Sequence, residues 1–214
     1  MIKGVLFDMD GVLVDSERYI CKAAQLMFKE LGIYVSPDDF IPFIGMGENK
    51  YLGGVAEKYK AEVDIERIKA RTYDIFASIV KDNLLPLPGA IEFISECREK
   101  GFKLALATSA DKVKMDVNLR EIGLPHSAFN SIITGIEVAN KKPFPDIYLK
   151  AAESICLKPE ECLVVEDAVS GIKAGRSAGC KCLAVTTSFS ALELSEADWI
   201  CDSLLNVPEE ALDW

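Results

Sequence analysis

Four carboxylates stand at the ends of two short apolar runs of the sequence, where they could do chemistry together. Asp8 and Asp10 follow the first run, and Glu166 and Asp167 follow the second. A carboxylate can attack phosphorus to form an aspartyl phosphate, and a carboxylic acid two residues further on can protonate the leaving oxygen and later deprotonate water. The pattern therefore favours Asp8 as a nucleophile and Asp10 as an acid and base.

Negative charge gathered in this way needs a cation. Buried carboxylates repel one another unless a positive ion lies between them. Mg²⁺ is a hard cation that keeps several of its waters and binds one or two carboxylates together with a phosphate oxygen. Asp8 and Asp167 suit that coordination, so the sequence predicts a magnesium site.

Hydroxyl and ammonium groups complete the set. Thr108 and Ser109 follow another apolar run, and Lys142 lies near a further one. One of these hydroxyls, the backbone N–H groups that follow at Ala110, and the lysine would neutralise the oxygens of a phosphoryl group. Each residue alone has an ordinary explanation, since Asp and Ser often cap helices and a loop lysine is often only solvated. The prediction of a phosphate site therefore rests on their occurrence together.

Short apolar runs bounded by turns or acidic residues predict the strands that position these groups. The runs cover residues 2–7, 103–107, 131–134, 163–165 and 182–185. Helical periodicity lies between them, and two of the helical segments end at glycines, Gly101 and Gly179. Alternating strands and helices are typical of an α/β fold with a doubly wound, Rossmann-like parallel sheet. Ligands of such sheets bind beyond the carboxyl ends of the strands, where the residues above stand.

The region from residue 16 to residue 86 interrupts this alternation. It has helical patterning, first over residues 20–31, and contains no convincing strand. We expect a small all-helical cap domain of residues 16–86, inserted after the first strand, and a core domain of residues 1–15 and 87–214. Proline and glycine in the segment 86–89 would give a stiff bend at one joint.

Charge and composition exclude several classes of function. The chain of 214 residues carries 34 acidic and 24 basic residues, and its net charge of −10 repels nucleic acid and anionic membranes. No cluster of lysine and arginine reverses this locally. No stretch approaches the roughly 18 apolar residues of a membrane span. We therefore expect neither a nucleic-acid partner nor a membrane partner.

Histidine and cysteine counts narrow the chemistry further. His126 is the only histidine, which excludes a two-histidine metal helix or a histidine relay, and its place beyond a helix end predicts a surface role. The seven cysteines are an odd number placed singly in apolar segments, so we expect reduced thiols in the cytoplasm. Cys180, Cys182 and Cys201 lack the spacing of a zinc site. The first residues enter a strand directly, so no leader is expected.

The chain resembles a known family, the haloacid dehalogenase-like phosphohydrolases, and within it the β-phosphoglucomutase-like branch with a helical cap. Four motifs carry the resemblance in the family's order and spacing: DMDGVLVDSE, LALATSA, KPFPDIYLKAA and VVEDAVSGIKAG. It implies Asp8 as the nucleophile and Asp10 as the acid and base, with the Asp10 carbonyl also on Mg²⁺. Asp10 argues against dehalogenation, because dehalogenases of the family lack this second aspartate.

The resemblance extends to the phosphate and metal groups. It implies Ser109 and Lys142 on the phosphate, and Glu166 with Asp167 around the metal. The sugar-phosphate mutases of this branch, however, carry a cap histidine at the position of Ile20 and an arginine at the position of Glu48. A mutase must retain and reorient a bisphosphate, so the loss of these groups favours hydrolysis.

Other cap residues are candidates for substrate contact. Lys50, Lys69 or Arg71 could replace the missing cationic clamp. The glycines around Gly45 lack the third glycine of a dinucleotide fingerprint, because Lys50 occupies its position. We expect this loop, with Gly45 and Lys50, to contact the substrate instead.

Together these features predict a Mg²⁺-dependent phosphatase that hydrolyses a small phosphorylated metabolite through an aspartyl phosphate, with the cap closing over the substrate. A sugar-phosphate mutase is the alternative enzyme. A receiver-like regulatory module, which is also phosphorylated on aspartate, needs neither Asp10 nor a cap. A catalytically idle binding protein would not need Asp8, Asp10, Lys142 and Asp167 intact. We expect a monomer or a weak dimer.

Overall fold

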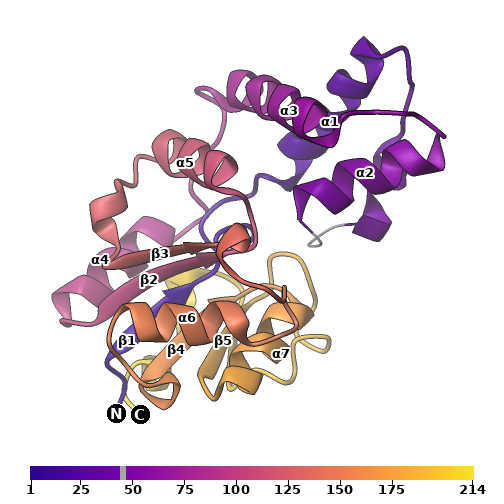
Figure 1. Cartoon of the computed structure of the whole chain (residues 1–214). Helices are drawn as coiled ribbons and strands as arrows, with labels where there is room; N and C mark the ends of the chain where they lie inside the picture. The colour runs from indigo at the N-terminus through magenta and orange to yellow at the C-terminus, as the bar shows by residue number, and fades with distance from the viewer. Residues whose placement is uncertain (44–46) are drawn as a thin grey trace.

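A six-stranded parallel sheet forms the centre of the computed structural model, which describes residues 1–43 and 47–214 (Figure 1). The strands are β1 (Gly4–Phe7), β2 (Lys103–Thr108), β3 (Ser131–Thr134), β4 (Cys162–Glu166), β5 (Lys181–Val185) and β6 (Trp199–Cys201). Their order in the sheet is β3-β2-β1-β4-β5-β6, and all neighbours are parallel. The predicted sheet is confirmed. β6 is not among the predicted strands, because its three residues are too few to form a recognisable apolar run.

Helices cover both faces of the sheet (Figure 1). The pair α4 (Ala90–Glu99) and α5 (Lys112–Glu121) lies on one face, and the pair α6 (Asp146–Ser154) and α7 (Val169–Ala178) lies on the other. Successive side chains of a strand point to opposite faces, so Phe7 packs with the first pair and Leu6 with the second. Because both faces are buried, the central strands are continuous apolar runs rather than alternating ones.

Aromatic packing anchors β1, the strand that precedes the first motif. The ring of Phe7 lies edge-on to that of Phe93 in α4, with centroids 5.9 Å apart, and to that of Phe129, with centroids 6.3 Å apart. Phe7 is fully buried. Burial of a side chain of this size stabilises a fold by about 1.5–3 kcal/mol. The end of β1 is therefore a rigid support for the residues that follow it.

Three helices of the insertion form the cap. They are α1 (Glu17–Glu30), α2 (Glu48–Lys58) and α3 (Ile65–Val80), with short 3-10 helices at Pro37–Asp39 and Ile41–Phe43. In Figure 1 they lie together beyond the end of the sheet, on the side of α5. Phe28, Phe40 and Tyr51 pack inside the cap, with the Phe40 and Tyr51 rings stacked at 4.8 Å. The helical insertion after the first strand is confirmed, and its buried apolar residues form one continuous cluster with those of β1 and α4.

Two segments that run side by side join the cap to the core. Val14 pairs with Pro86 in an isolated antiparallel bridge, and the N–H of Leu87 donates to the carbonyl of Leu13 over 2.9 Å. This pairing lies at the predicted joints. The domain boundaries at 15/16 and 86/87 themselves stay a prediction.

Membrane spans, cysteines and the histidine can now be compared with the expectations from composition. None of its helices combines the length and the apolar character needed to cross a membrane. All seven cysteines are free, and five of them are buried, while Cys21 is half-buried and Cys156 exposed. The His126 side chain is exposed, with Nε2 3.0 Å from Oδ1 of Asp116, so its predicted surface position is confirmed.

Candidate active site

Asp8 stands at the centre of the sheet edge, directly after β1. Its N–H continues the sheet by donating to the carbonyl of Val165 in β4 over 3.0 Å, and only 8% of the residue is exposed. The chain then turns back on itself, because the N–H groups of Leu13 and Val14 donate to the carbonyl of Met9. The motif after β1 is therefore a compact loop and not an extended segment.

Gly11 brings this loop against Asp167. Its φ is +77°, and a Cβ at this position would lie 1.8 Å from Oδ2 of Asp167. A left-handed conformation without space for a side chain admits only glycine. The first motif and the end of β4 consequently meet at a distance that no other residue allows.

Lys142 reaches Asp8 from the loop that precedes α6. Its Nζ lies 2.5 Å from Oδ1 of Asp8 and 2.7 Å from Oε1 of Glu166, and 7% of its side chain is exposed. Burial lowers the pKa of Lys142, but the charges of Asp8 and Glu166 outweigh this effect and raise it above its ordinary value. The ammonium group is therefore a fixed positive charge beside Asp8.

Glu166, the last residue of β4, orients this lysine. Its Oε1 accepts hydrogen bonds from Lys142 and from the Tyr148 hydroxyl, the latter over 2.9 Å. Its Oε2 accepts the N–H groups of Asp167 and Ala168, both over 2.9 Å. Because four donors fix the Glu166 carboxylate, it can hold Lys142 in one position. Its predicted place around the metal stays a prediction.

Three carboxylates form a group with the chemistry of a metal site. Asp8, Glu166 and Asp167 each offer an oxygen within 4.8 Å of the others. Burial, opposed by Lys142, raises the pKa of Asp8 to about 7, and burial with repulsion from Glu166 and Asp8 raises that of Asp167 to about 8. Such values mean that one lysine does not compensate the buried negative charge. Carboxylate oxygens in this number fit a hard divalent cation such as Mg²⁺.

Mg²⁺ is accordingly expected to raise the melting temperature of the protein, and to do so more at about pH 9 than at about pH 6. Asp8 and Asp167 hold protons below their pKa values of about 7 and about 8, and must release them to bind a cation. Without a cation, the folded state keeps protons that the unfolded state has released, so stability falls as the pH rises toward about 8. Thermal melts with and without Mg²⁺ at both pH values measure the effect.

Two matched variants control this prediction. Asp167→Asn should lose most of the Mg²⁺-induced shift in melting temperature. Asp15→Asn should keep it, because the Asp15 side chain is 52% exposed and pairs only loosely, at 3.9 Å, with Arg18. A shift that is the same in the wild type and in Asp167→Asn would contradict the metal site.

The end of β2 brings the predicted phosphate-binding segment to the same edge. Thr108 is buried, and its Oγ1 accepts the N–H of Ala110 over 3.1 Å. The Ser109 carbonyl packs against Gly135, where a Cβ would come within 2.2 Å of that oxygen. The turn is thus held tightly beside the end of β1. The phosphate contacts of Thr108, Ser109 and Ala110 stay predictions, and the Ala110 N–H is engaged within the turn.

The carboxylate of Asp10 is directed toward other partners than that of Asp8. Its Oδ2 lies 2.9 Å from Nζ of Lys114, and its Oδ1 accepts the hydroxyl of Ser16. Within the described residues, the group of three carboxylates that could hold a metal does not include Asp10. This separation suits a group that exchanges protons while Asp8 attacks. The predicted contact of the Asp10 carbonyl with the metal stays a prediction.

Of the three basic cap residues considered as a substrate clamp, Lys50, Lys69 and Arg71, the last two form ion pairs within the protein. Arg71 pairs with Glu30 at 2.7 Å on the surface of the cap. Lys69 donates to Asn49 over 2.8 Å and lies 3.4 Å from Asp111, the N-cap of α5. Lys69 therefore ties the cap to the core, and Arg71 ties α3 to α1. Both charges are already compensated within the protein.

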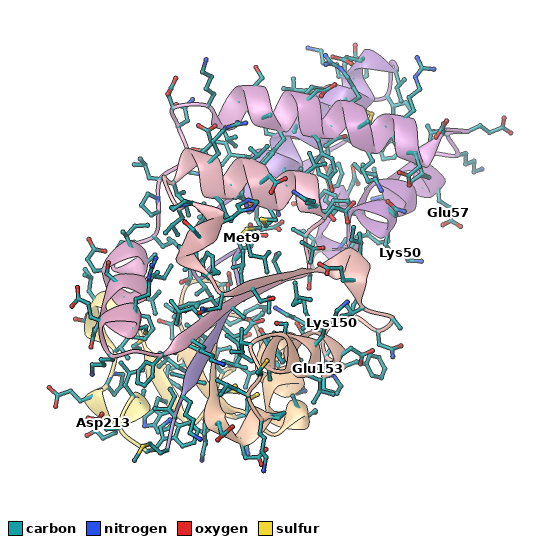
Figure 2. The ribbon with its side chains drawn as sticks, turned by 60° about the vertical axis from the view of Figure 1, so that its left-hand side comes forward. Met9, Lys50, Glu57, Lys150, Glu153 and Asp213 are labelled. Atoms are coloured by element: carbon teal, nitrogen blue, oxygen red, sulfur yellow. The ribbon has the colours of Figure 1, made fainter. Side chains whose placement is uncertain are left out.

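The other cap residues singled out in the sequence differ in how exposed they are. Lys50 is exposed in the first turn of α2 (Figure 2). Gly45 lies outside the described residues. Ile20 is buried in the cap. Glu48 begins α2, and burial raises the pKa of its carboxyl. The cap thus has a carboxylate at the position where the family resemblance leads us to expect an arginine in a mutase.

Two residues of the site are absent from the sequence-based predictions. Tyr148 follows the apolar period of α6, yet its hydroxyl reaches Glu166. Lys114 lies in α5 with 3% exposure, one turn before the fully buried Asn118. Polar residues at positions i and i+4 on the buried side of a helix are the one signal in the sequence that could have pointed to Lys114.

Comparisons with known proteins identify the family of the chain. The family described as haloacid dehalogenase-like hydrolase matches residues 5–185. The chain is 41% identical over 199 residues to the Arabidopsis thaliana protein SUPPRESSOR OF QUENCHING 1, chloroplastic, covering 92% of the chain but 19% of that protein. It is 33% identical over 207 residues to hexitol phosphatase A of Escherichia coli (strain K12), covering 94% of the chain and 91% of the relative.

A solved structure extends this agreement to the fold. The crystal structure of CbbY from Rhodobacter sphaeroides in complex with phosphate has a TM-score of 0.88 to this chain, at 26% identity and over the full length of both. The likeness includes the cap as well as the sheet. These matches confirm the resemblance seen in the motifs, and the chain belongs to the haloacid dehalogenase-like hydrolase family.

Proposed function

We propose that the protein is a Mg²⁺-dependent phosphatase of small phosphorylated carbohydrates that works through an aspartyl phosphate on Asp8. The observation that carries this proposal is the placement of Asp8 at 2.5 Å from a buried lysine and within one group with Asp167, while the Asp10 carboxylate points elsewhere. Carbohydrate phosphates are favoured because hexitol phosphatase A is similar over nearly its whole length. A cytoplasmic location and a monomer or weak dimer remain part of the proposal.

The proposed reaction has two steps. An Oδ atom of Asp8 attacks the phosphorus of the ester and the P–O bond to the carbohydrate breaks. The leaving oxygen takes the proton of Asp10, which enters this step as the carboxylic acid, with Glu17 as the remaining carboxylate beside Lys114. A water molecule then attacks the phosphorus of the aspartyl phosphate and gives a proton to Asp10, while the Asp8 oxygen leaves with its bonding electrons. The products are the alcohol, inorganic phosphate and the original enzyme.

Electrostatic stabilisation supports both steps. Lys142 is held in place by Glu166 and would neutralise charge that develops on the phosphoryl oxygens. When bound at Asp8 and Asp167, Mg²⁺ would supply further charge neutralisation to the same oxygens. Burial of these groups strengthens each interaction, because the local dielectric constant is low. Closure of the cap would exclude bulk water.

Hydrolysis is favoured over mutase chemistry by the cap. A mutase must hold a second phosphate while the bisphosphate turns over. In this chain Ile20 is apolar and Glu48 is acidic, so neither can hold a phosphate. Lys69 and Arg71 are basic, but each already pairs with a carboxylate. Released phosphate is therefore the expected product.

A screen of phosphorylated carbohydrates tests the proposal, with phosphate release and isomer formation followed in the same samples. We expect Mg²⁺-dependent release of phosphate from one or more hexose or hexitol monophosphates, without faster formation of an isomer. Isomerised sugar phosphate that appears faster than free phosphate would make the protein a mutase. A phosphorylated state that lasts for hours without substrate would instead favour a regulatory module.

A further inference from the structure

A buried lysine of α5 contacts the proposed acid and base. Nζ of Lys114 lies 2.9 Å from Oδ2 of Asp10 and 3.4 Å from Oε1 of Glu17, the first residue of α1. Only 4% of its side chain is exposed. Burial lowers the pKa of Lys114, but the charges of Asp10 and Glu17 outweigh this effect and raise it above its ordinary value. A buried ammonium group is tolerated only when it is paired, so these two carboxylates hold Lys114 where it is.

The second oxygen of Asp10 is held from the same helix. Oδ1 accepts the hydroxyl of Ser16, and the Ser16 oxygen accepts Nδ2 of Asn118 over 3.2 Å. Ser16 and Asn118 are fully buried. Lys114 and Asn118 lie one turn apart on α5, so one helix of the core constrains both oxygens of Asp10, directly at Oδ2 and through Ser16 at Oδ1. The plane of the Asp10 carboxyl group is thereby set.

We propose that Lys114 is a positioning residue for the proton transfers of Asp10. This inference rests on the proposed function. Without the ammonium group, Asp10 would keep the Ser16 contact alone and could rotate about its side-chain bonds. Proton transfer needs a donor and acceptor about 2.6–3.2 Å apart, so a misdirected Asp10 protonates the leaving oxygen slowly.

The attack by Asp8 should not depend on Lys114. In the described part of the chain, the hydrogen bonds and ion pairs of Lys114 go to Asp10 and Glu17. Those of Lys142 go instead to Asp8, Glu166 and a carbonyl. The two lysines thus serve different halves of the site, one beside the nucleophile and one beside the acid.

The choice of leaving group separates the two roles. An alkyl phosphate has a poor leaving group that needs a proton, whereas p-nitrophenolate leaves without one. We expect Lys114→Met to lower kcat/KM about 10–100-fold for the best alkyl phosphate of the substrate screen, a part of the ~10²–10⁴-fold that general acid catalysis contributes. For p-nitrophenyl phosphate, kcat/KM should change less than about threefold, because this parameter reports only the steps up to transfer onto Asp8.

Lys112→Met is the matched control. Lys112 lies two residues earlier on α5, its side chain is 62% exposed and it pairs with Asp116. The substitution Lys112→Met removes the same charge from the same helix. It should leave kcat/KM unchanged for both the alkyl phosphate and p-nitrophenyl phosphate. Any unfolded fraction of Lys114→Met lowers both activities equally, so the alkyl-to-aryl ratio reports on the folded molecules.

A double-mutant cycle with Asp10→Asn identifies the residue through which Lys114 acts. If Lys114 works through Asp10, adding Lys114→Met to Asp10→Asn should change the alkyl phosphate rate by less than about twofold, since coupled residues are not additive. An equal loss on both substrates, an unchanged alkyl rate, or full additivity in the cycle would overturn the proposal. Failure of the proposed function is distinct from this: the wild type would then hydrolyse neither ester.

Discussion

Replacing Asp8 by asparagine is expected to lower kcat/KM by at least about 10⁴-fold for every phosphorylated substrate, as removal of a covalent nucleophile does in other enzymes. The amide lacks the negative oxygen that attacks phosphorus. It also leaves Nζ of Lys142, now 2.5 Å from a carboxylate oxygen, beside a neutral group. Steady-state kinetics on the substrates of the screen measure the loss.

Asp15→Asn controls this result, because it makes the same chemical change at an exposed residue beyond the catalytic loop. It should keep wild-type kcat/KM. Thermal melts of both variants show whether they are folded. Wild-type turnover by folded Asp8→Asn would exclude a covalent step on Asp8.

The second large effect is expected for Lys142→Met. Loss of the ammonium group leaves Asp8 and Glu166 buried without their shared partner, and it removes positive charge from the phosphoryl oxygens. We expect kcat to fall about 10²–10³-fold, as after removal of one donor to a developing anion. The protein should also lose about 3–5 kcal/mol of stability, because a broken buried ion pair leaves uncompensated charge. Mg²⁺ should restore part of that stability.

Lys150→Met separates these effects from a general loss of charge. Lys150, labelled in Figure 2, lies in α6 and is 42% exposed; its Nζ donates to the carbonyl of Glu137 over 2.8 Å and lies 3.8 Å from the Glu137 carboxylate. Urea unfolding and kinetics should both stay near the wild type. If Lys142→Met kept more than about a tenth of the wild-type kcat in its folded fraction, the electrostatic role given to Lys142 would be wrong.

The meeting of Asp8, Asp167 and Glu166 could be predicted from the sequence, because it follows from topology. Each stands at the carboxyl end of an apolar run, and the carboxyl ends of parallel strands share one edge. β1 and β4 are neighbours in the sheet, and Gly11 permits the close contact between their loops. Local sequence signals of this kind need no knowledge of side-chain packing.

The direction of the Asp10 carboxylate could not be predicted in this way. Two residues of spacing place Asp10 beside Asp8, but the partner of its Oδ2 is a lysine more than a hundred positions later, reached only when α5 packs on the sheet. The role of Glu166 is hidden for the same reason. As a strand-end carboxylate it is predicted near the metal and lies in one group with Asp8 and Asp167, but the four donors to its oxygens are known only from the folded protein.

The cap shows the same limit. Lys69 and Arg71 are two residues apart on α3 and equally basic, yet one pairs with Asp111 of the core and the other with Glu30 of the cap. Their partners are distant in the sequence, so only tertiary structure decides which of them lies near the core. We expect substrate specificity to depend on such cap contacts, so the motifs point to a reaction class more closely than to a metabolite.

The central claim is the covalent intermediate on Asp8. The most direct test mixes the Asp10→Asn variant with p-nitrophenyl phosphate and then stops the reaction with acid. The aryl group leaves without a proton, but hydrolysis of the aspartyl phosphate needs the base that Asp10 provides. We predict a burst of about one p-nitrophenolate per enzyme and one phosphoryl group on the peptide that contains Asp8, detected by mass spectrometry. An unmodified Asp8 peptide, with no burst and with steady hydrolysis of the same ester by the wild type, would contradict the account.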